Sequence, residues 1–418
     1  MLNPYNYHVA VRDDTMFFGR EQLIHHLVDG LNASVPLSTA IFGGRRIGKT
    51  SLLSKLARVL NSPDAEIRAG RRFVPCMLDM QRGRPLACSD DFFLWVLDEF
   101  GATWERQHDL EPGVVVESLQ SLYRHRAGRG PVDAFVQAFQ TLNKQGERLR
   151  MVILLDESEE ILSVNWGEDL RPNLRALLSN SPIVEEVALV MAGSTQMYTQ
   201  VTERDSPLEN ILDRCTLSGL SYEATLALAR TPNQNRLSET LAEEVWRHTG
   251  GHPCMAQYLL HKVWEELDGS LEDATPELLQ TLAETFDERT RHFSAWAHTI
   301  GKNGNATYRF LAEQVEPVSY TTLRQHFSTL SSGHLQGALD ALIYHGLVNC
   351  EGRGKRCRYQ AAGQMYKDWF LAAGEIDESE SVETPPEPPQ IIVHGDYIVG
   401  DGNVIGDGSE AEVKKREP

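Results

Sequence analysis

The stretch from Ser38 to Thr50 reads Ser-Thr-Ala-Ile-Phe-Gly-Gly-Arg-Arg-Ile-Gly-Lys-Thr, and it decides the fold of this chain. Its first five residues are typical of a short strand buried in a sheet. Gly43 to Thr50 then match the pattern Gly-x-x-x-x-Gly-Lys-Ser/Thr, and leucines follow at helical spacing up to Leu60. A glycine-rich loop between a strand and a helix turns its backbone N–H groups inward, where they can bind phosphate. The stretch therefore predicts a loop that holds the phosphates of a nucleotide.

Individual residues of this loop have predicted contacts. Lys49 is expected to reach the β- and γ-phosphates, and Thr50 offers its hydroxyl to Mg²⁺. The other residues are expected to surround the phosphates, mainly with their amides. The predicted nucleotide-binding residues of this region are Gly43, Gly44, Arg45, Arg46, Ile47, Gly48, Lys49, Thr50 and Ser51.

An apolar strand that ends in two acids supplies the second half of the predicted site. It reads Met151-Val-Ile-Leu-Leu-Asp156-Glu157. We expect Asp156 to hold Mg²⁺ through water and Glu157 to orient and polarise the attacking water, which makes Glu157 a predicted catalytic residue.

A polar turn follows the next apolar strand, at Ala192-Gly-Ser194-Thr195. Ser194, or Thr195, is predicted to sense the γ-phosphate or position water, and Ser194 is the second predicted catalytic residue. The alternative is an ordinary strand-to-helix turn with a serine cap. Arg214 is either a sensor arginine or a solvated surface charge.

Short apolar runs alternate with helical patterns through the first half of the chain. The predicted strands lie at 38–42, 73–80, 151–155, 187–192 and 215–217. This alternation predicts an α/β P-loop NTPase core, a parallel sheet with helices on both faces. We expect a lead-in at 1–16, the NTPase domain at 17–220, a helical lid at 221–300, a winged-helix domain at 301–373, an acidic Pro/Glu linker at 374–389 and a short, β-prone Gly-Asp repeat tail at 390–418.

Composition narrows the class of protein. The chain has 418 residues and a net charge of −19, which argues against a general nucleic-acid coat. Six scattered cysteines without a Cys-x-x-Cys pair predict neither a disulfide framework nor a zinc site. Neither a secretory signal nor an apolar run long enough to span a bilayer is apparent, so we expect a cytoplasmic protein.

Four elements in this order resemble the STAND class of signal-transduction NTPases, close to the archaeal-type ATPase branch of the AAA+-related proteins. They are Phe17-Phe-Gly19-Arg20-Glu21, the loop at 43–50, the acidic strand end at 153–157 and Gly250-Gly-His252-Pro253. The resemblance implies that Gly19 and Arg20 lie beside the adenine and ribose. It also implies that His252 and Pro253 face the nucleotide from the lid. The alternative is a helix-breaking turn at 250–253, with His252 at the surface or packed in the protein.

The family implies a molecular switch with the cofactors ATP and Mg²⁺. ATP binds between the α/β domain and the lid, an expected slow ATPase activity resets the switch, and lid and winged helix reorient. Expected partners are ATP or ADP, further copies of the chain on activation and an effector, in bacterial conflict or antiphage defence. No guanine-reading Asn-Lys-x-Asp pattern is present, which favours ATP over GTP. A scaffold whose tail is its only output is a further alternative.

The tail and the winged helix leave alternatives open. The Gly-Asp repeat at 390–407 resembles amyloid-like signalling segments that stack with a matching tail on an effector, and a disordered tail or one surface hairpin fits equally. Arg353, Lys355, Arg356 and Arg358 would suit the wing of a DNA-associated ATPase of the origin-recognition or transposition-helper type. The predicted recognition helix at 333–346 is poor in Arg and Lys, which favours packing on the nucleotide domain.

Overall fold

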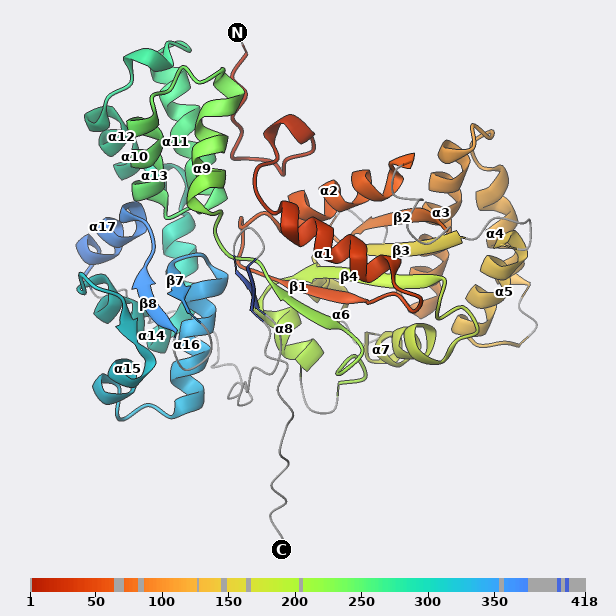
Figure 1. The fold of residues 1–418 in the computed structure, drawn as a ribbon. Coiled ribbons are helices and arrows are strands. Elements are labelled where there is room, and N and C mark those ends of the chain that lie inside the picture. The colour runs from red at the N-terminus through yellow and green to blue at the C-terminus, as the bar shows by residue number, and fades with distance from the viewer. Residues whose placement is uncertain are drawn as a thin grey trace, which may run out of the picture.

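Five parallel strands form the centre of the first half of the chain in the computed structural model (Figure 1). The structure describes residues 2–63, 71–81, 86–125, 128–143, 149–162, 167–202, 206–352, 357–374, 397–399 and 403–405. The strands are β1 (Thr39–Phe42), β2 (Arg72–Asp79), β3 (Leu149–Asp156), β4 (Val187–Gly193) and β5 (Asp213–Thr216), in the spatial order β2-β3-β4-β1-β5. Because all five are parallel, their carboxyl ends meet at one edge of the sheet.

Helices cover both faces of this sheet, which is why its central strands are largely apolar, whereas the edge strand β5 reads Asp-Arg-Cys-Thr. One face packs on α1 (Glu21–Asn32) and α2 (Lys49–Asn61), and the other on α3 (Ser89–Gln107), α6 (Glu159–Leu162), α7 (Gly167–Arg175) and α8 (Thr195–Thr202). A 3₁₀ turn at Asp14–Met16 precedes α1, and a π-helical turn at Ala176–Asn180 follows α7. This is the predicted α/β P-loop NTPase core, with parallel sheet and two helical layers.

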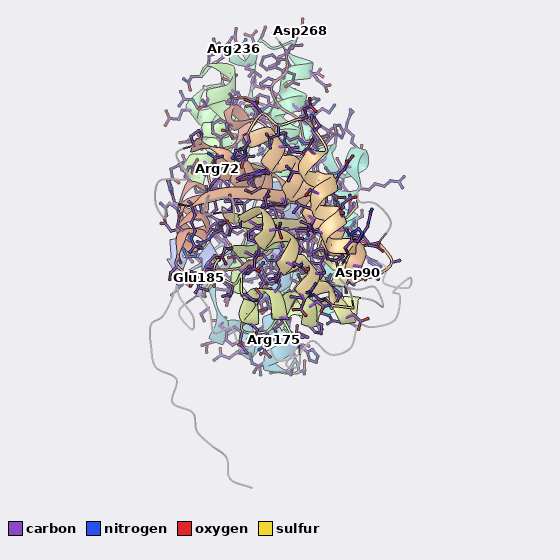
Figure 2. The ribbon with its side chains drawn as sticks, turned by 90° about the vertical axis from the view of Figure 1, so that its right-hand side faces the viewer. Arg72, Asp90, Arg175, Glu185, Arg236 and Asp268 are labelled. Atoms are coloured by element: carbon purple, nitrogen blue, oxygen red, sulfur yellow. A yellow bond between two sulfur atoms is a disulfide. The ribbon has the colours of Figure 1, made fainter. Side chains whose placement is uncertain are left out.

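Two further helices, α4 (Val114–Arg124) and α5 (Pro131–Asn143), pack outside α3. Figure 2 faces this end of the molecule and labels Asp90, near the start of α3. The Tyr123 hydroxyl of α4 donates to the Asp90 carboxylate over 2.6 Å and ties the outer helix to the inner one.

The second half of the chain is helical. The lid region holds α9 (Tyr222–Arg230), α10 (Glu239–Thr249), α11 (Pro253–Glu266), α12 (Pro276–Glu284) and α13 (Phe286–Thr290), with 3₁₀ turns at Thr231–Asn233 and Leu271–Asp273. After it come α14 (His292–Ala312), α15 (Tyr320–His326), α16 (Ser332–Tyr344) and α17 (Gln364–Ala372). A small antiparallel sheet orders β6 (Val318–Ser319), β8 (Arg358–Ala361) and β7 (Val348–Glu351).

One hydrophobic core joins these two helical regions. Helix α14 runs through the predicted boundary at residue 300, with a kink at Gly301, where φ is 69°. The elements after α14 include two of the three expected helices and the expected hairpin. Their interpretation as a winged helix stays a prediction, as do the domain boundaries.

The β7–β8 hairpin corrects one expectation. The structure pairs Cys350 with Cys357 as a disulfide, with Cα atoms 5.8 Å apart. The two cysteines are seven positions apart along the chain, and the antiparallel pairing of β7 with β8 brings them together. Three of the four cationic residues predicted for the wing, Arg353, Lys355 and Arg356, lie outside the described residues.

Part of the Gly-Asp tail forms a two-stranded hairpin of β9 (Tyr397–Val399) and β10 (Asn403–Ile405), and β9 lies beside β5 (Figure 1). The rest of the tail and nearly all of the predicted linker lie outside the described residues, so stacking between chains stays a prediction. Across the ranges that the structure describes, no helix combines the length and apolar character needed to cross a membrane.

Candidate nucleotide-binding site

The glycine-rich loop connects the end of β1 to the start of α2, as predicted. Gly48 has φ = 102°, a left-handed conformation that glycine adopts without strain, and it precedes the first residue of α2. The Lys49 side chain is buried, and its Nζ donates to the carbonyls of Gly43 and Gly44, both over 3.0 Å. Burial lowers the Lys49 pKa, and the carboxylate of Glu157 is the strongest influence in the opposite direction.

The carboxylates at the end of β3 lie at the same edge of the sheet. Asp156 is only 2% exposed, and its side chain is hydrogen-bonded to that of Thr50. Burial raises the pKa of Asp156, while the bond with Thr50 lowers it. Glu157 follows in a left-handed turn with φ = 52°, and burial raises its pKa as well.

These groups fit a magnesium ion. A hydroxyl and a carboxylate in direct contact are hard oxygen donors, the type that Mg²⁺ prefers. Thr50 and Asp156, the two predicted metal ligands, are therefore together in the structure, at the start of a helix and the end of a strand.

A cavity of about 770 Å³ opens above this edge, within the range typical of small-molecule sites. Its phosphate end is lined by the loop and by strand-end residues: Arg45, Arg46, Ile47, Gly48, Lys49, Thr50, Ser51, Asp79, Gln81, Asp156 and Glu157. The same cavity is also lined by residues from outside the loop that include Phe17, Phe18, Arg20, Leu220, Leu228, Pro253 and Cys254. Its lining thus combines charged groups with apolar side chains, a mixture that suits a nucleotide.

Several predicted residues do not line this cavity. Gly19 precedes Arg20, whose guanidinium donates to the Ser218 carbonyl, and only Arg20 of this pair is part of the wall. Gly43 and Gly44 are not among the lining residues, and a Cβ on Gly44 would meet His345.

His252 does not line the cavity and is packed in the protein, as in the alternative interpretation of its motif. Its ring is fully buried, packs on Trp296 with centroids 4.7 Å apart, and finds no hydrogen-bond partner for either nitrogen among the described residues. Burial lowers the pKa of His252 to about 3. As the residue before α11, His252 points into a junction with Trp296 and Gly346, whereas Pro253 next to it lines the cavity.

Ser194 serves as a cap in this structure. Its backbone N–H donates to Glu159 Oε1 over 3.1 Å, and its hydroxyl accepts from the Gln196 N–H at the start of α8 over 3.4 Å. Ser194 does not line the cavity. Arg214 is hydrogen-bonded to Tyr198 rather than directed at the phosphate end.

The end of α16 packs against the back of the phosphate loop, a contact that the sequence did not predict. The Gly44 N–H donates to the Tyr344 carbonyl over 2.6 Å, and a Cβ on Gly44 would lie 2.8 Å from His345. Only glycine allows this approach. The Tyr344 ring is 4% exposed and belongs to the same hydrophobic core as Phe42.

The lead-in is also part of the site. Tyr5 is buried in the lid, where its hydroxyl donates to the Ala229 carbonyl over 3.0 Å. Farther along, Arg46 of the loop donates to the His8 carbonyl over 2.9 Å, and the Val11 N–H donates to Ser51 Oγ over 3.0 Å. Residues 6–12 thus form one wall of the cavity and connect the lid to the phosphate loop.

Known structures share this fold. The Walker-type ATPase PABY2304 of Pyrococcus abyssi is similar with a TM-score of 0.52 at 13% identity, covering 87% of this chain and 99% of that one. The ORC2 protein of Aeropyrum pernix, solved as ADPNP–ADP complexes, has a TM-score of 0.47 at 14% identity, covering 89% and 96%. The first of these supports the fold alone, since so low an identity carries no function.

No curated protein matches the chain. The family model for Novel STAND NTPase 1 matches residues 6–294, a span that includes the lead-in, the phosphate loop, the acidic strand end and the lid. With more than half of its length matched, this chain belongs to the Novel STAND NTPase 1 family.

Proposed function

We propose that this protein is an ATP-binding signal-transduction switch in which slow hydrolysis resets the bound state. The loop amides and Lys49 bind the triphosphate, and Thr50 and Asp156 hold Mg²⁺, which supplies charge neutralisation at the phosphates. Glu157 orients the attacking water and accepts its proton. Its carboxylate lies at the cavity wall, in the electrostatic field of Lys49, which suits this role.

The base end of the cavity supports ATP. Phe17, Phe18 and Leu220 offer apolar contacts to a purine, and the backbone of residues 8–11 runs along the same cavity. The base is therefore met by groups from the lead-in, the core and the lid, so its binding holds these parts together.

The hydrogen bond from Gly44 to the Tyr344 carbonyl is the observation that carries the switch. The phosphate loop has one face toward the cavity and another toward α16, so a change in loop shape on binding or losing phosphate must alter the contact with α16. We infer that this contact holds the closed state and that its loss releases the region after α14.

The setting is proposed from the family and the tail. Release of the C-terminal region would free surfaces for assembly with further copies and present the Gly-Asp tail to an effector carrying a matching segment. A role in bacterial conflict or antiphage defence, in the cytoplasm, fits this design.

The test uses two substitutions and isothermal calorimetry. Lys49→Ala removes the charge at the phosphates and is expected to abolish ATP binding. Glu157→Gln keeps the shape of the side chain but removes the carboxylate that accepts a proton. This variant is expected to bind ATP with wild-type affinity but not to hydrolyse it. Wild-type affinity in Lys49→Ala would end the proposal.

The DNA-associated alternative finds less support. The helix expected to read DNA corresponds to α16, whose Leu335, Leu339 and Leu342 are buried and whose last residue docks on the phosphate loop. Arg358 donates to the Pro317 carbonyl over 3.5 Å within its own small sheet. Salt-sensitive DNA binding that is lost on neutralising Arg358 would reverse this preference.

A further inference from the structure

A second carboxylate stands beside Asp156 at the edge of the sheet. Strands β2 and β3 are parallel and pair Asp79 with Asp156, and the Met80 N–H continues the pairing by donating to the Asp156 carbonyl over 3.3 Å. Paired residues on neighbouring strands point to the same face of a sheet. The two carboxylates therefore leave the sheet on the same side.

That side is the one covered by α2. Alternate residues of the two strands, Phe73, Met77, Val152 and Leu154, pack with α1 and α2, whereas Val74, Cys76, Leu78, Ile153 and Leu155 pack on the opposite face. Asp79 and Asp156 continue the first series. Helix α2 packs on both strands and begins with Lys49 and Thr50, so Asp79 faces the start of the helix that carries the predicted metal ligand.

Asp79 lines the same cavity as Asp156 and Glu157, and the cationic residues Arg45, Arg46 and Lys49 of the phosphate loop line it as well. A third carboxylate therefore stands at the end of the cavity where the loop and the predicted metal ligands meet. Protein-bound Mg²⁺ usually keeps several waters and is held through one or two carboxylates together with substrate phosphates. Two carboxylates on adjacent strand ends can accept hydrogen bonds from such waters on two sides.

We propose that Asp79 is a positioning residue for the divalent cation, acting from β2 as Asp156 acts from β3. The inference rests on the proposed function, because it concerns the metal that accompanies the nucleotide. Asp79 also accepts from the Gln81 N–H over 3.1 Å, a bond that fixes its own turn. A purely structural role in that turn is the competing explanation.

The experiment compares ATP affinity with Mg²⁺ and with EDTA in the full-length protein carrying Asp79→Asn. Asparagine keeps an oxygen for the Gln81 N–H but removes the charge. We expect affinity about 10-fold lower with Mg²⁺, the usual effect of losing an outer-shell metal partner, and no loss with EDTA. Asp213→Asn, the same change on the opposite edge strand, is the matched control and should keep the wild-type response to Mg²⁺.

A second readout is independent of hydrolysis. Paramagnetic resonance of Mn²⁺, titrated into the protein with ATP, should show weaker ion binding in Asp79→Asn than in Asp213→Asn. Equal losses of ATP affinity with Mg²⁺ and EDTA, or an unchanged response to Mg²⁺, would assign Asp79 to its turn and overturn the inference. If the wild-type protein does not bind ATP, the proposed function is overturned as well. This outcome is seen in the wild-type protein itself, whereas the other two outcomes concern only the response of Asp79→Asn to Mg²⁺.

Discussion

Acid should open the junction between the lid, α14 and the phosphate loop, because two buried imidazoles there cannot easily be charged. His252 packs on Trp296, and His345 lies against Gly44 and close to Trp296, with centroids 6.3 Å apart. Burial lowers the pKa of His252 to about 3 and that of His345 to about 4, from a usual value of 6.5. Both rings are therefore neutral in the closed structure at pH 5.

The sign follows from linkage. In the unfolded chain both imidazoles bind a proton as the pH falls below 6.5, while in the folded protein they do so only near pH 3 to 4. Their contribution to stability is complete above pH 6.5 and is lost as the pH falls toward 4. Between pH 6.5 and 5, each ring should cost roughly 2 kcal/mol of unfolding free energy.

Urea unfolding at a series of pH values, followed by tryptophan fluorescence, measures this slope. His252→Gln and His345→Gln should each be less stable at pH 7.5 yet lose about 1.4 kcal/mol less per pH unit below pH 6. Buried carboxylates act in the opposite direction, since burial raises the pKa of Asp340 to about 6, so the comparison between variants isolates the imidazoles.

The control is His26→Gln, which makes the same change at a partly exposed imidazole outside this junction, 3.7 Å from the Asp213 carboxylate. If His252→Gln and His345→Gln kept the wild-type acid slope, the two rings would not be the neutral groups of the junction, and the reasoning would be wrong.

Three further changes test other contacts. Tyr344→Ala should weaken docking of α16 by about 3 kcal/mol, the usual cost of truncating a buried aromatic ring. Limited proteolysis should then cut this variant after α14 faster than it cuts Tyr222→Ala, the control, because Tyr222 is 38% exposed. Arg150→Met should lower the free energy of unfolding by about 3 kcal/mol and with it the urea midpoint, because the fully buried guanidinium donates to the carbonyls of Leu31, Ala33, Ser34 and Glu185. An unchanged midpoint would contradict this. Arg46→Ala should release a fluorescent ADP analogue about 5-fold faster in stopped flow, since the loss of its bonds to the lead-in costs about 1 kcal/mol. An unchanged release rate would show that these bonds do not help to retain the nucleotide.

Local patterns were sufficient to predict the core. The strands β1 to β4 are largely apolar runs, whereas β5 is a short polar edge strand, and all five lie within two residues of the predicted ranges. The proximity of Thr50 and Asp156 could be predicted from the sequence, because a parallel sheet places the carboxyl ends of all its strands at one edge. The same signal was present at Met77-Leu-Asp79, where another apolar run ends in an acid, and it would have identified Asp79.

Contacts between distant segments could not be predicted from such patterns. Nothing near Gly44 indicates that Tyr344, 300 positions later, will bond to it, because that contact depends on how the helical half docks. The Gly-Gly-His-Pro motif correctly indicated a turn before α11, but the direction of the His252 ring depends on Trp296, which belongs to another helix. The lead-in lacked any motif, and its bonds to the phosphate loop come from backbone groups that every residue carries.

The position of the phosphate loop explains how a small ligand could move a large part of this chain. A nucleotide can shift an equilibrium only by its difference in affinity for the two states, so the closed and open forms must differ at the nucleotide itself. Here Lys49 bonds to the Gly43 and Gly44 carbonyls, and the next group on the outer face of Gly44 is the Tyr344 carbonyl. A lysine drawn toward a γ-phosphate must loosen its hold on the two glycines, and one of them, Gly44, contacts the end of α16 directly. Coupling of this kind requires no long pathway, since the residues that meet the phosphate and the residues that hold the C-terminal region are neighbours in one loop.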